Sequence, residues 1–125
     1  MSIKDLEPKV IWSRFYDITQ IPRPSKKEER ILAYLIDFAK QYNLDYKQDE
    51  AGNILITKNA TLGKEDSPTV ILQSHVDMVC EKNSDVVHDF DNDPIDTIID
   101  DEWVKTKGTT LGADNGIGMA AALAV

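Results

Sequence analysis

The spacing of apolar residues predicts two helices in the first third of the chain. Apolar side chains recur at intervals of three and four over residues 8–20, the period of one helical face. The prolines that follow directly cannot continue a helix. Residues 25–42 carry a broader apolar stripe, wide enough to pack against a sheet. Ser25 and Glu28 have the spacing of a capping box, so we expect Ser25 to be the N-cap of this second helix.

Shorter patterns farther along the chain predict strands. Residues 44–49 and 54–58 flank a turn that contains Gly-Asn, and together they predict a hairpin. Residues 68–74 include the run Val-Ile-Leu and predict a buried central strand. Residues 97–105 predict a second hairpin, bent at a pair of aspartates. The order helix, helix, hairpin, buried strand, helix predicts an α/β fold with a mixed β-sheet flanked by helices.

A histidine and an aspartate follow this predicted strand. Side chains alternate sides along a strand, so His75 and Asp77 are expected to point to the same side. At the carboxyl end of an α/β strand, that side faces the crevice where ligands bind. The two residues are then a metal ligand with its orienting carboxylate, or half of an acid–base pair. The alternative is a histidine with a purely structural role.

A glycine-rich turn at residues 108–118 presents one carboxylate, Asp114, before an apolar helix. The simplest interpretation makes Asp114 the N-cap of that helix. If Asp114 instead meets His75, the two side chains form part of a zinc site. A phosphate-binding loop is disfavoured, because the Lys-Ser/Thr ending is missing and Asp114 would repel a phosphate.

Composition narrows the classes of partner. The 125 residues contain 14 Lys and Arg against 22 Asp and Glu, so the net charge is −8, which disfavours nucleic acid and anionic membranes as partners. No apolar run approaches the ~20 residues that span a bilayer. The single cysteine, Cys80, allows no intrachain disulfide, and we expect a cytoplasmic protein. The acidic residues 89–100 lack the glycine and the final glutamate of a calcium-binding EF-hand, so a solvated loop is favoured.

The last residues of the chain predict the beginning of a helix without its end. Residues 118–125 are apolar and lack a terminating glycine or a basic last turn. We therefore expect the chain to be a fragment of a longer protein. The sequence leaves open whether the apolar face of this helix pairs with a second copy in a homo-oligomer.

Several motifs together resemble a known family. The chain is similar to the amino-terminal part of the bacterial aminoacyl-histidine dipeptidases, which are related to two-zinc exopeptidases and aminoacylases. The resemblance runs along nearly the whole chain, and its motifs are Ile21-Pro-Arg-Pro-Ser25, Gly52-Asn-Ile-Leu-Ile56, Ser74-His-Val-Asp-Met78, Lys82-Asn83, Val87-His-Asp-Phe90, Asp93-Pro-Ile95, Glu102-Trp-Val-Lys105 and Gly108-Thr-Thr-Leu-Gly-Ala-Asp-Asn-Gly-Ile-Gly118.

The resemblance implies a role for each candidate residue. His75 would ligate one zinc ion, Asp77 would be the catalytic residue that holds the imidazole, and Asp114 would bridge two zinc ions. Cobalt or manganese would be able to substitute for zinc. The activity implied is hydrolysis of dipeptides, with a carboxyl-terminal histidine preferred. The general base and the remaining ligands would follow Val125. Because two ligands cannot complete a zinc site, we expect this chain alone to be inactive.

Two other functions stay open. A related metal-dependent deacylase of N-acyl amino acids would use the same residues, and the residues beyond Val125 would distinguish it. A non-catalytic acidic binding module would be a cooperative monomer, which the uncovered apolar helix at the end of the chain disfavours.

Overall fold

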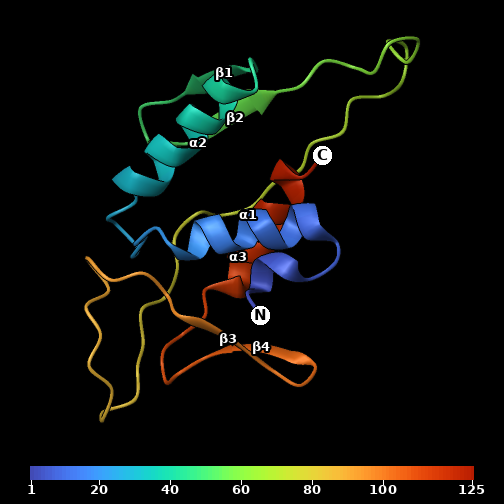
Figure 1. The fold of residues 1–125 in the computed structure, drawn as a ribbon. Helices are drawn as coiled ribbons and strands as arrows, with labels where there is room; N and C mark the ends of the chain where they lie inside the picture. Colours follow the sequence, from blue (N-terminus) through green and yellow to red (C-terminus); the bar gives the residue numbers. More distant parts are fainter. The chain divides into compact units, whose positions relative to one another are not determined.

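The computed structural model describes residues 1–125 and consists of two compact units (Figure 1). The first unit comprises Met1–Ile31 and Gln73–Val125, and the second comprises Leu32–Leu72. The elements in order are a short 3-10 helix η1 (Ile3–Asp5), α1 (Lys9–Thr19), α2 (Glu29–Gln41), β1 (Asp45–Gln48), β2 (Ile54–Thr57), β3 (Thr97–Asp100), β4 (Trp103–Thr106) and α3 (Ala113–Leu123).

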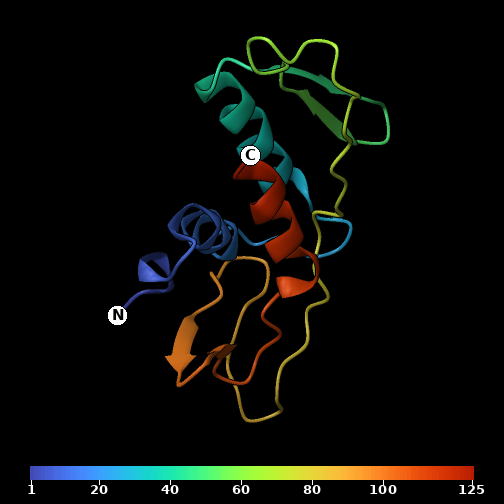
Figure 2. The same ribbon diagram turned by 90° about the vertical axis from the view of Figure 1, so that its right-hand side faces the viewer.

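Two helices from opposite ends of the chain form the centre of the first unit. Helices α1 and α3 pack against each other, as both ribbon views show (Figures 1 and 2). They approach closely at Gly116, where an added Cβ would lie 3.1 Å from the Phe15 ring. Phe15, Ile18 and Met119 are buried in this core. The predicted first helix is therefore confirmed, and its apolar face packs against the last helix of the chain.

The hairpin β3–β4 belongs to the first unit and is attached to the end of α1. Its strands pair antiparallel, with Thr97 opposite Thr106 and Asp100 opposite Trp103. Just before β3, the amide of Ile95 donates to the carbonyl of Thr19 at 2.8 Å. The prediction of a bent hairpin over residues 97–105 is confirmed.

The second unit contains most of α2 and the hairpin β1–β2. The strands pair antiparallel, with Asp45 opposite Thr57 and Gln48 opposite Ile54. The carboxylate of Asp49 accepts two hydrogen bonds from Asn53, both at 2.8 Å, and these close the turn. Gly52 in that turn has a φ of +92°, a conformation that a residue without Cβ adopts at little cost. This hairpin was also predicted correctly.

The predicted central strand is absent. Residues 68–77 lie outside any strand, and the only sheets are the two antiparallel pairs. A strand requires a neighbour that completes its backbone hydrogen bonds, and no other strand of this chain pairs with this segment. Val70 and Ile71 are instead 77% and 80% exposed. The chain contains helices and two antiparallel hairpins, but it forms no mixed sheet.

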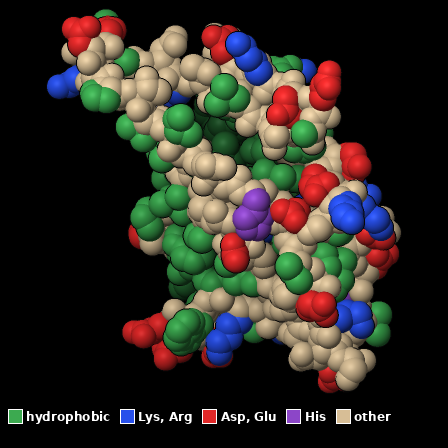
Figure 3. Space-filling model, turned by 180° about the vertical axis from the view of Figure 1, so that it is seen from behind, with side chains coloured by type: hydrophobic (Ala, Val, Ile, Leu, Met, Phe, Trp, Pro, Cys, Tyr) green, Lys and Arg blue, Asp and Glu red, His purple; other side chains and the backbone are tan.

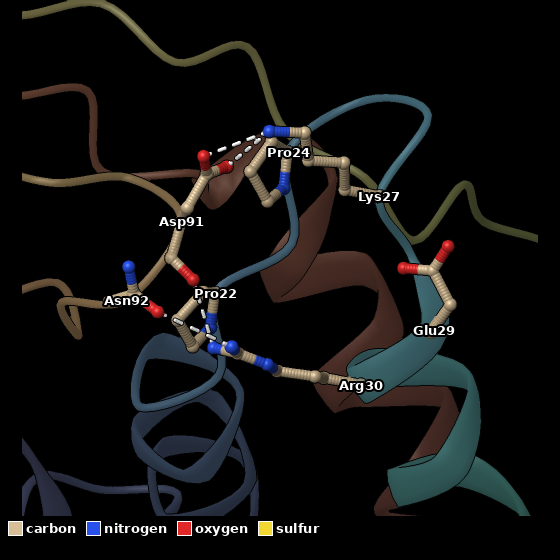
Figure 4. A pocket seen from close by; sticks show the side chains of 7 residues that line it. All are labelled: Pro22, Pro24, Lys27, Glu29, Arg30, Asp91 and Asn92. Carbon is tan, nitrogen blue, oxygen red and sulfur yellow. Dashed lines mark hydrogen bonds and ion pairs between the residues drawn. The ribbon is translucent and has the colours of Figure 1, made fainter.

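A shallow pocket of about 290 Å³ lies in the first unit (Figure 4). Lys27 reaches across it to both carboxylate oxygens of Asp91, each at 2.8 Å, and Arg30 donates to the Asp91 carbonyl at 2.9 Å. These contacts tie the acidic loop to the segment before α2 and to the first turn of that helix. No candidate site residue lines this pocket. None of the helices is long and apolar enough to cross a membrane.

Candidate active site

The segment that carries His75 and Asp77 is fixed from its carboxyl side. Met78 is 4% exposed, and its amide donates to the carbonyl of Arg23 at 3.0 Å. Pro24 and Met78 form an isolated parallel bridge, and Lys82 and Thr109 form an antiparallel one. The chain therefore holds this segment through the residues before α2 and after β4, without a sheet.

The structure brings His75 and Asp77 together, although the segment that carries them is not a strand. His75 Nδ1 lies 3.0 Å from Asp77 Oδ1 and 3.1 Å from the Asp77 carbonyl. With a proton on Nδ1, the imidazole donates to this residue, and its Nε2 lone pair points the other way. Asp77 thus orients the ring.

Asp114 lies at the other ring nitrogen. The distance from His75 Nε2 to Asp114 Oδ1 is 3.2 Å. The Asp114 side chain is 98% exposed, so its second oxygen is open to solvent. The interpretation of Asp114 as an N-cap is wrong, because Gly112 is the N-cap of α3, with a φ of +72°. The backbone of Asp114 is not helical, and its peptide bond to Asn115 is cis.

Ser25 is a site residue that the sequence pattern did not reveal. Its hydroxyl donates to Asp77 Oδ2, the oxygen that His75 does not use. The predicted capping box is therefore wrong, and α2 begins at Glu29. Glu28 accepts from the amide of Lys26 at 2.7 Å instead. In the sequence, a serine three residues before a glutamate is compatible with a helix N-cap and with a residue of the candidate site. The pairing of Pro24 with Met78 in the structure shows that Ser25 lies at the candidate site.

Arg23 connects the two segments that carry the site. Its side chain is buried, and Nη1 donates to the carbonyls of Val76 and Asp77 at 3.0 and 2.9 Å. Nη2 donates to the carbonyl of Gly112 at 2.6 Å. Burial lowers the pKa of the guanidinium, whereas the charge of Asp77 acts to raise it. The group nevertheless stays protonated, as arginine does throughout proteins.

The paired charges shift the two central ionisations in opposite directions. The hydrogen bond to Asp114 is the largest effect and raises the pKa of His75; burial acts against it, and the hydrogen bond to Asp77 adds to the rise. The hydroxyl of Ser25, followed by His75, lowers the pKa of Asp77. The site therefore favours an ionised Asp77 and a positive charge near the His75 ring.

The donor groups fit part of a metal site. With Nδ1 protonated, the Nε2 lone pair of His75 faces a carboxylate oxygen at 3.2 Å, and two lone pairs at this distance require a proton or a cation near them. Two tetrahedral ligands with bonds of about 2.0–2.1 Å are themselves about 3.3 Å apart, which matches this separation. The chain supplies no third ligand, because no further histidine, cysteine or carboxylate completes a metal-binding group with these two residues.

The candidate site is accessible from solvent. The His75 side chain is half exposed, and that of Asp77 is about one-third exposed. Figure 3 shows a histidine at the surface with acidic side chains beside it and hydrophobic side chains around them. A ligand could therefore reach the ring nitrogen and the Asp114 carboxylate without any opening of the core.

Comparison with known proteins confirms the predicted resemblance. The chain is 53% identical over 123 residues to the cytosol non-specific dipeptidase of Escherichia coli K12, covering 98% of this chain and 25% of that protein. The structure of an aminoacylhistidine dipeptidase from Vibrio alginolyticus matches with a TM-score of 0.97 and 50% identity, over 99% of this chain and 25% of that one. No model of a protein family matches.

A more distant structure has the same fold. A tripeptidase from Staphylococcus aureus subsp. aureus Mu50 matches with a TM-score of 0.74 and 26% identity, over 94% of this chain and 31% of that one. These structural matches confirm the predicted α/β class. The chain spans about a quarter of the length of the dipeptidases that it matches.

Proposed function

We propose that this chain, which resembles the aminoacyl-histidine dipeptidases along nearly its whole length, is the amino-terminal portion of the catalytic domain of a metal-dependent peptidase. The proteins that it resembles are named as dipeptidases and a tripeptidase, which supports hydrolysis of short peptides. The rest of the catalytic domain would follow Val125.

One observation carries this proposal. His75 Nε2 faces Asp114 Oδ1 at 3.2 Å while Asp77 engages Nδ1. A histidine that is oriented by one carboxylate and faces a second at ligand–ligand distance is the arrangement of a metal ligand with its supporting group. A purely structural histidine would leave the exposed carboxylate of Asp114 unexplained.

Each residue would have a distinct part in the reaction. His75 and Asp114 would hold zinc, with Asp114 as the bridge between two ions. When bound, zinc supplies an activated water and polarises the scissile carbonyl. Asp77 keeps the proton on Nδ1, so the Nε2 lone pair stays free for the metal. Ser25 fixes the second oxygen of Asp77, so the carboxylate cannot rotate away from the ring.

The proposed substrates are dipeptides, with a carboxyl-terminal histidine preferred, and the proposed location is the cytoplasm. The name of the Vibrio alginolyticus relative supports the preference for histidine, whereas that of the Escherichia coli relative supports a cytosolic location and a broader range of dipeptides. We expect cobalt or manganese to substitute for zinc. The general base and the missing ligands would lie beyond Val125, so this chain alone would be inactive.

The test compares two aspartate variants in the full-length protein. Asp114→Asn removes a ligand charge at nearly constant volume. Asp91→Asn, at the surface ion pair with Lys27, is the matched control. We expect Asp114→Asn to reduce hydrolysis of a Xaa-His dipeptide by more than about 100-fold, beyond the loss typical of a supporting group. Asp91→Asn should leave the activity unchanged. Chelation should abolish wild-type activity, and added zinc should restore it.

Two results would contradict the proposal. Full activity after chelation would exclude a metal-dependent mechanism. An Asp114→Asn protein as active as the Asp91→Asn protein would remove Asp114 from the site. A panel of dipeptides with and without carboxyl-terminal histidine, together with an N-acyl amino acid, would then define the substrate class. Zinc titration of the 125-residue chain should show weak binding or none, because only two ligands are present.

A further inference from the structure

We propose that Arg23 is a positioning residue that sets the separation of the two segments bearing the metal ligands. This inference rests on the proposed function. One guanidinium spans the gap between the His75-Val76-Asp77 segment and the turn that precedes Asp114. Arg23 touches none of the reacting groups directly; it acts through the backbone that carries them.

The contacts show why the position of both ligands depends on this side chain. Nη1 holds the carbonyls of Val76 and Asp77, which follow His75 directly. Nη2 holds the carbonyl of Gly112, two residues before Asp114. The three acceptors lie 53, 54 and 89 residues away in the sequence.

Two glycines make room for this contact. A Cβ built on Gly112 would lie 2.6 Å from Arg23 Nη2, and one built on Gly116 would lie 2.8 Å from it. Both distances are too short for a real side chain, so any larger residue would displace the guanidinium. The glycine-rich turn that superficially suggests a phosphate loop thus accommodates an internal cation.

The buried charge is not explained by stability alone. Arg23 is 1% exposed, and its acceptors are neutral carbonyls. Replacing buried charges by apolar residues of similar volume is often neutral or stabilising. A guanidinium instead offers donors in a fixed planar geometry, which suits a spacer between two segments. A purely structural role therefore predicts that an apolar replacement would be tolerated at the site as well as in the fold.

The first experiment replaces Arg23 in the full-length protein. Arg23→Met keeps the volume and removes the donors, and Arg23→Lys keeps the charge on a single nitrogen. Ile3→Ala, a buried core position of η1, is the control for general loss of stability. Zinc affinity is measured by competition with a chromophoric chelator, together with kcat, KM and the melting temperature.

We expect Arg23→Met to lower zinc affinity and kcat by about 10–100-fold, the range found when groups that orient metal ligands are removed. Arg23→Lys should recover part of this loss, because one ammonium can reach one segment but cannot hold both. Ile3→Ala should lower the melting temperature and leave zinc affinity unchanged.

A second variant leaves Arg23 in place and displaces it. Gly116→Ala introduces the Cβ that would meet Nη2, in a helix where alanine is otherwise favourable. We expect it to lower zinc affinity in the wild-type background and to have little further effect in the Arg23→Ala background. Such non-additivity is the signature of two residues that act through one contact.

The outcomes separate this inference from the function on which it rests. Zinc affinity and kcat at wild-type levels in Arg23→Met would overturn the inference while the proposed function stands. Additive effects of Gly116→Ala and Arg23→Ala would also overturn it, since Gly116 would then act through Phe15. If Arg23→Met fails to fold, Arg23→Lys and Gly116→Ala decide by the same readouts. A wild-type protein without zinc binding or peptide hydrolysis would overturn the proposed function and the inference with it.

Discussion

Two apolar segments flank His75, and their environments are opposite. On the amino side, Val70, Ile71 and Leu72 are 77%, 80% and 55% exposed and lie outside any strand. On the carboxyl side, Met78 is 4% exposed and held by the Arg23 carbonyl. Val79, next to Met78, is itself 67% exposed, so hydrophobicity alone does not decide which side chain is buried. Met78 is buried at the position where the chain supplies a hydrogen-bond partner for the backbone.

The comparison predicts that truncating an apolar side chain to alanine affects the stability of the 125-residue chain unequally at the two positions. Met78→Ala removes a buried side chain and should lower the free energy of unfolding by about 2–5 kcal/mol. Ile71→Ala removes an exposed one and should change it by less than about 0.5 kcal/mol. Urea unfolding followed by circular dichroism measures both.

An equal loss of unfolding free energy in the two variants would contradict the comparison, because Ile71 would then be buried in solution. Measuring the same two variants in the full-length protein tests the comparison further. If the rest of that protein supplies a neighbouring strand, Ile71→Ala should there approach the loss expected of a buried residue.

A smaller effect is expected from removing the hydroxyl of Ser25, which donates a hydrogen bond to Asp77. Ser25→Ala removes the hydrogen bond to Asp77 and frees that carboxylate to rotate. We expect zinc affinity and kcat of the full-length protein to fall by about 10-fold, the lower end for supporting groups. Ser67→Ala, in an exposed loop, is the matched control. Equal activity of the two variants would exclude a supporting role for Ser25.

The smallest effect concerns protonation of His75 in the chelated 125-residue chain. Asp114 and Asp77 raise its pKa in the folded state, so the protonated ring stabilises the fold. This contribution is fully present below the ordinary histidine pKa and is lost as the pH rises through the raised value. NMR titration of the ring in Asp114→Asn should show the pKa closer to its ordinary value. An unchanged midpoint would contradict the contact with Asp114.

The sequence predicts those features that depend on local chemistry. Helix α1 and both hairpins follow from residues close in the chain. The contact between His75 and Asp77 is also local, but it forms without the strand from which it was predicted. The residues alone suggest a partial metal site, whereas the two-zinc mechanism and the dipeptidase family follow from resemblance. The mixed sheet could not be predicted reliably, because pairing of residues 68–74 depends on strands that an apolar run does not specify.

The residues missed at the site share a different property. Ser25 and Arg23 act on groups more than fifty positions away, through contacts that no local spacing encodes. A serine before a helix predicts a cap, and an arginine between prolines predicts an exposed turn. Only the bridge between Pro24 and Met78 turns both side chains toward the candidate site.

The buried guanidinium also limits how this site could be transplanted. A designer who grafts only the His-x-Asp segment onto another scaffold would transfer the ligand without its spacing. The smallest portable unit has three pieces, which are residues 23–25, 75–78 and 112–118. A receiving scaffold must therefore offer three anchor points and an interior void for one cation. That requirement excludes most small hosts before any side chain is chosen.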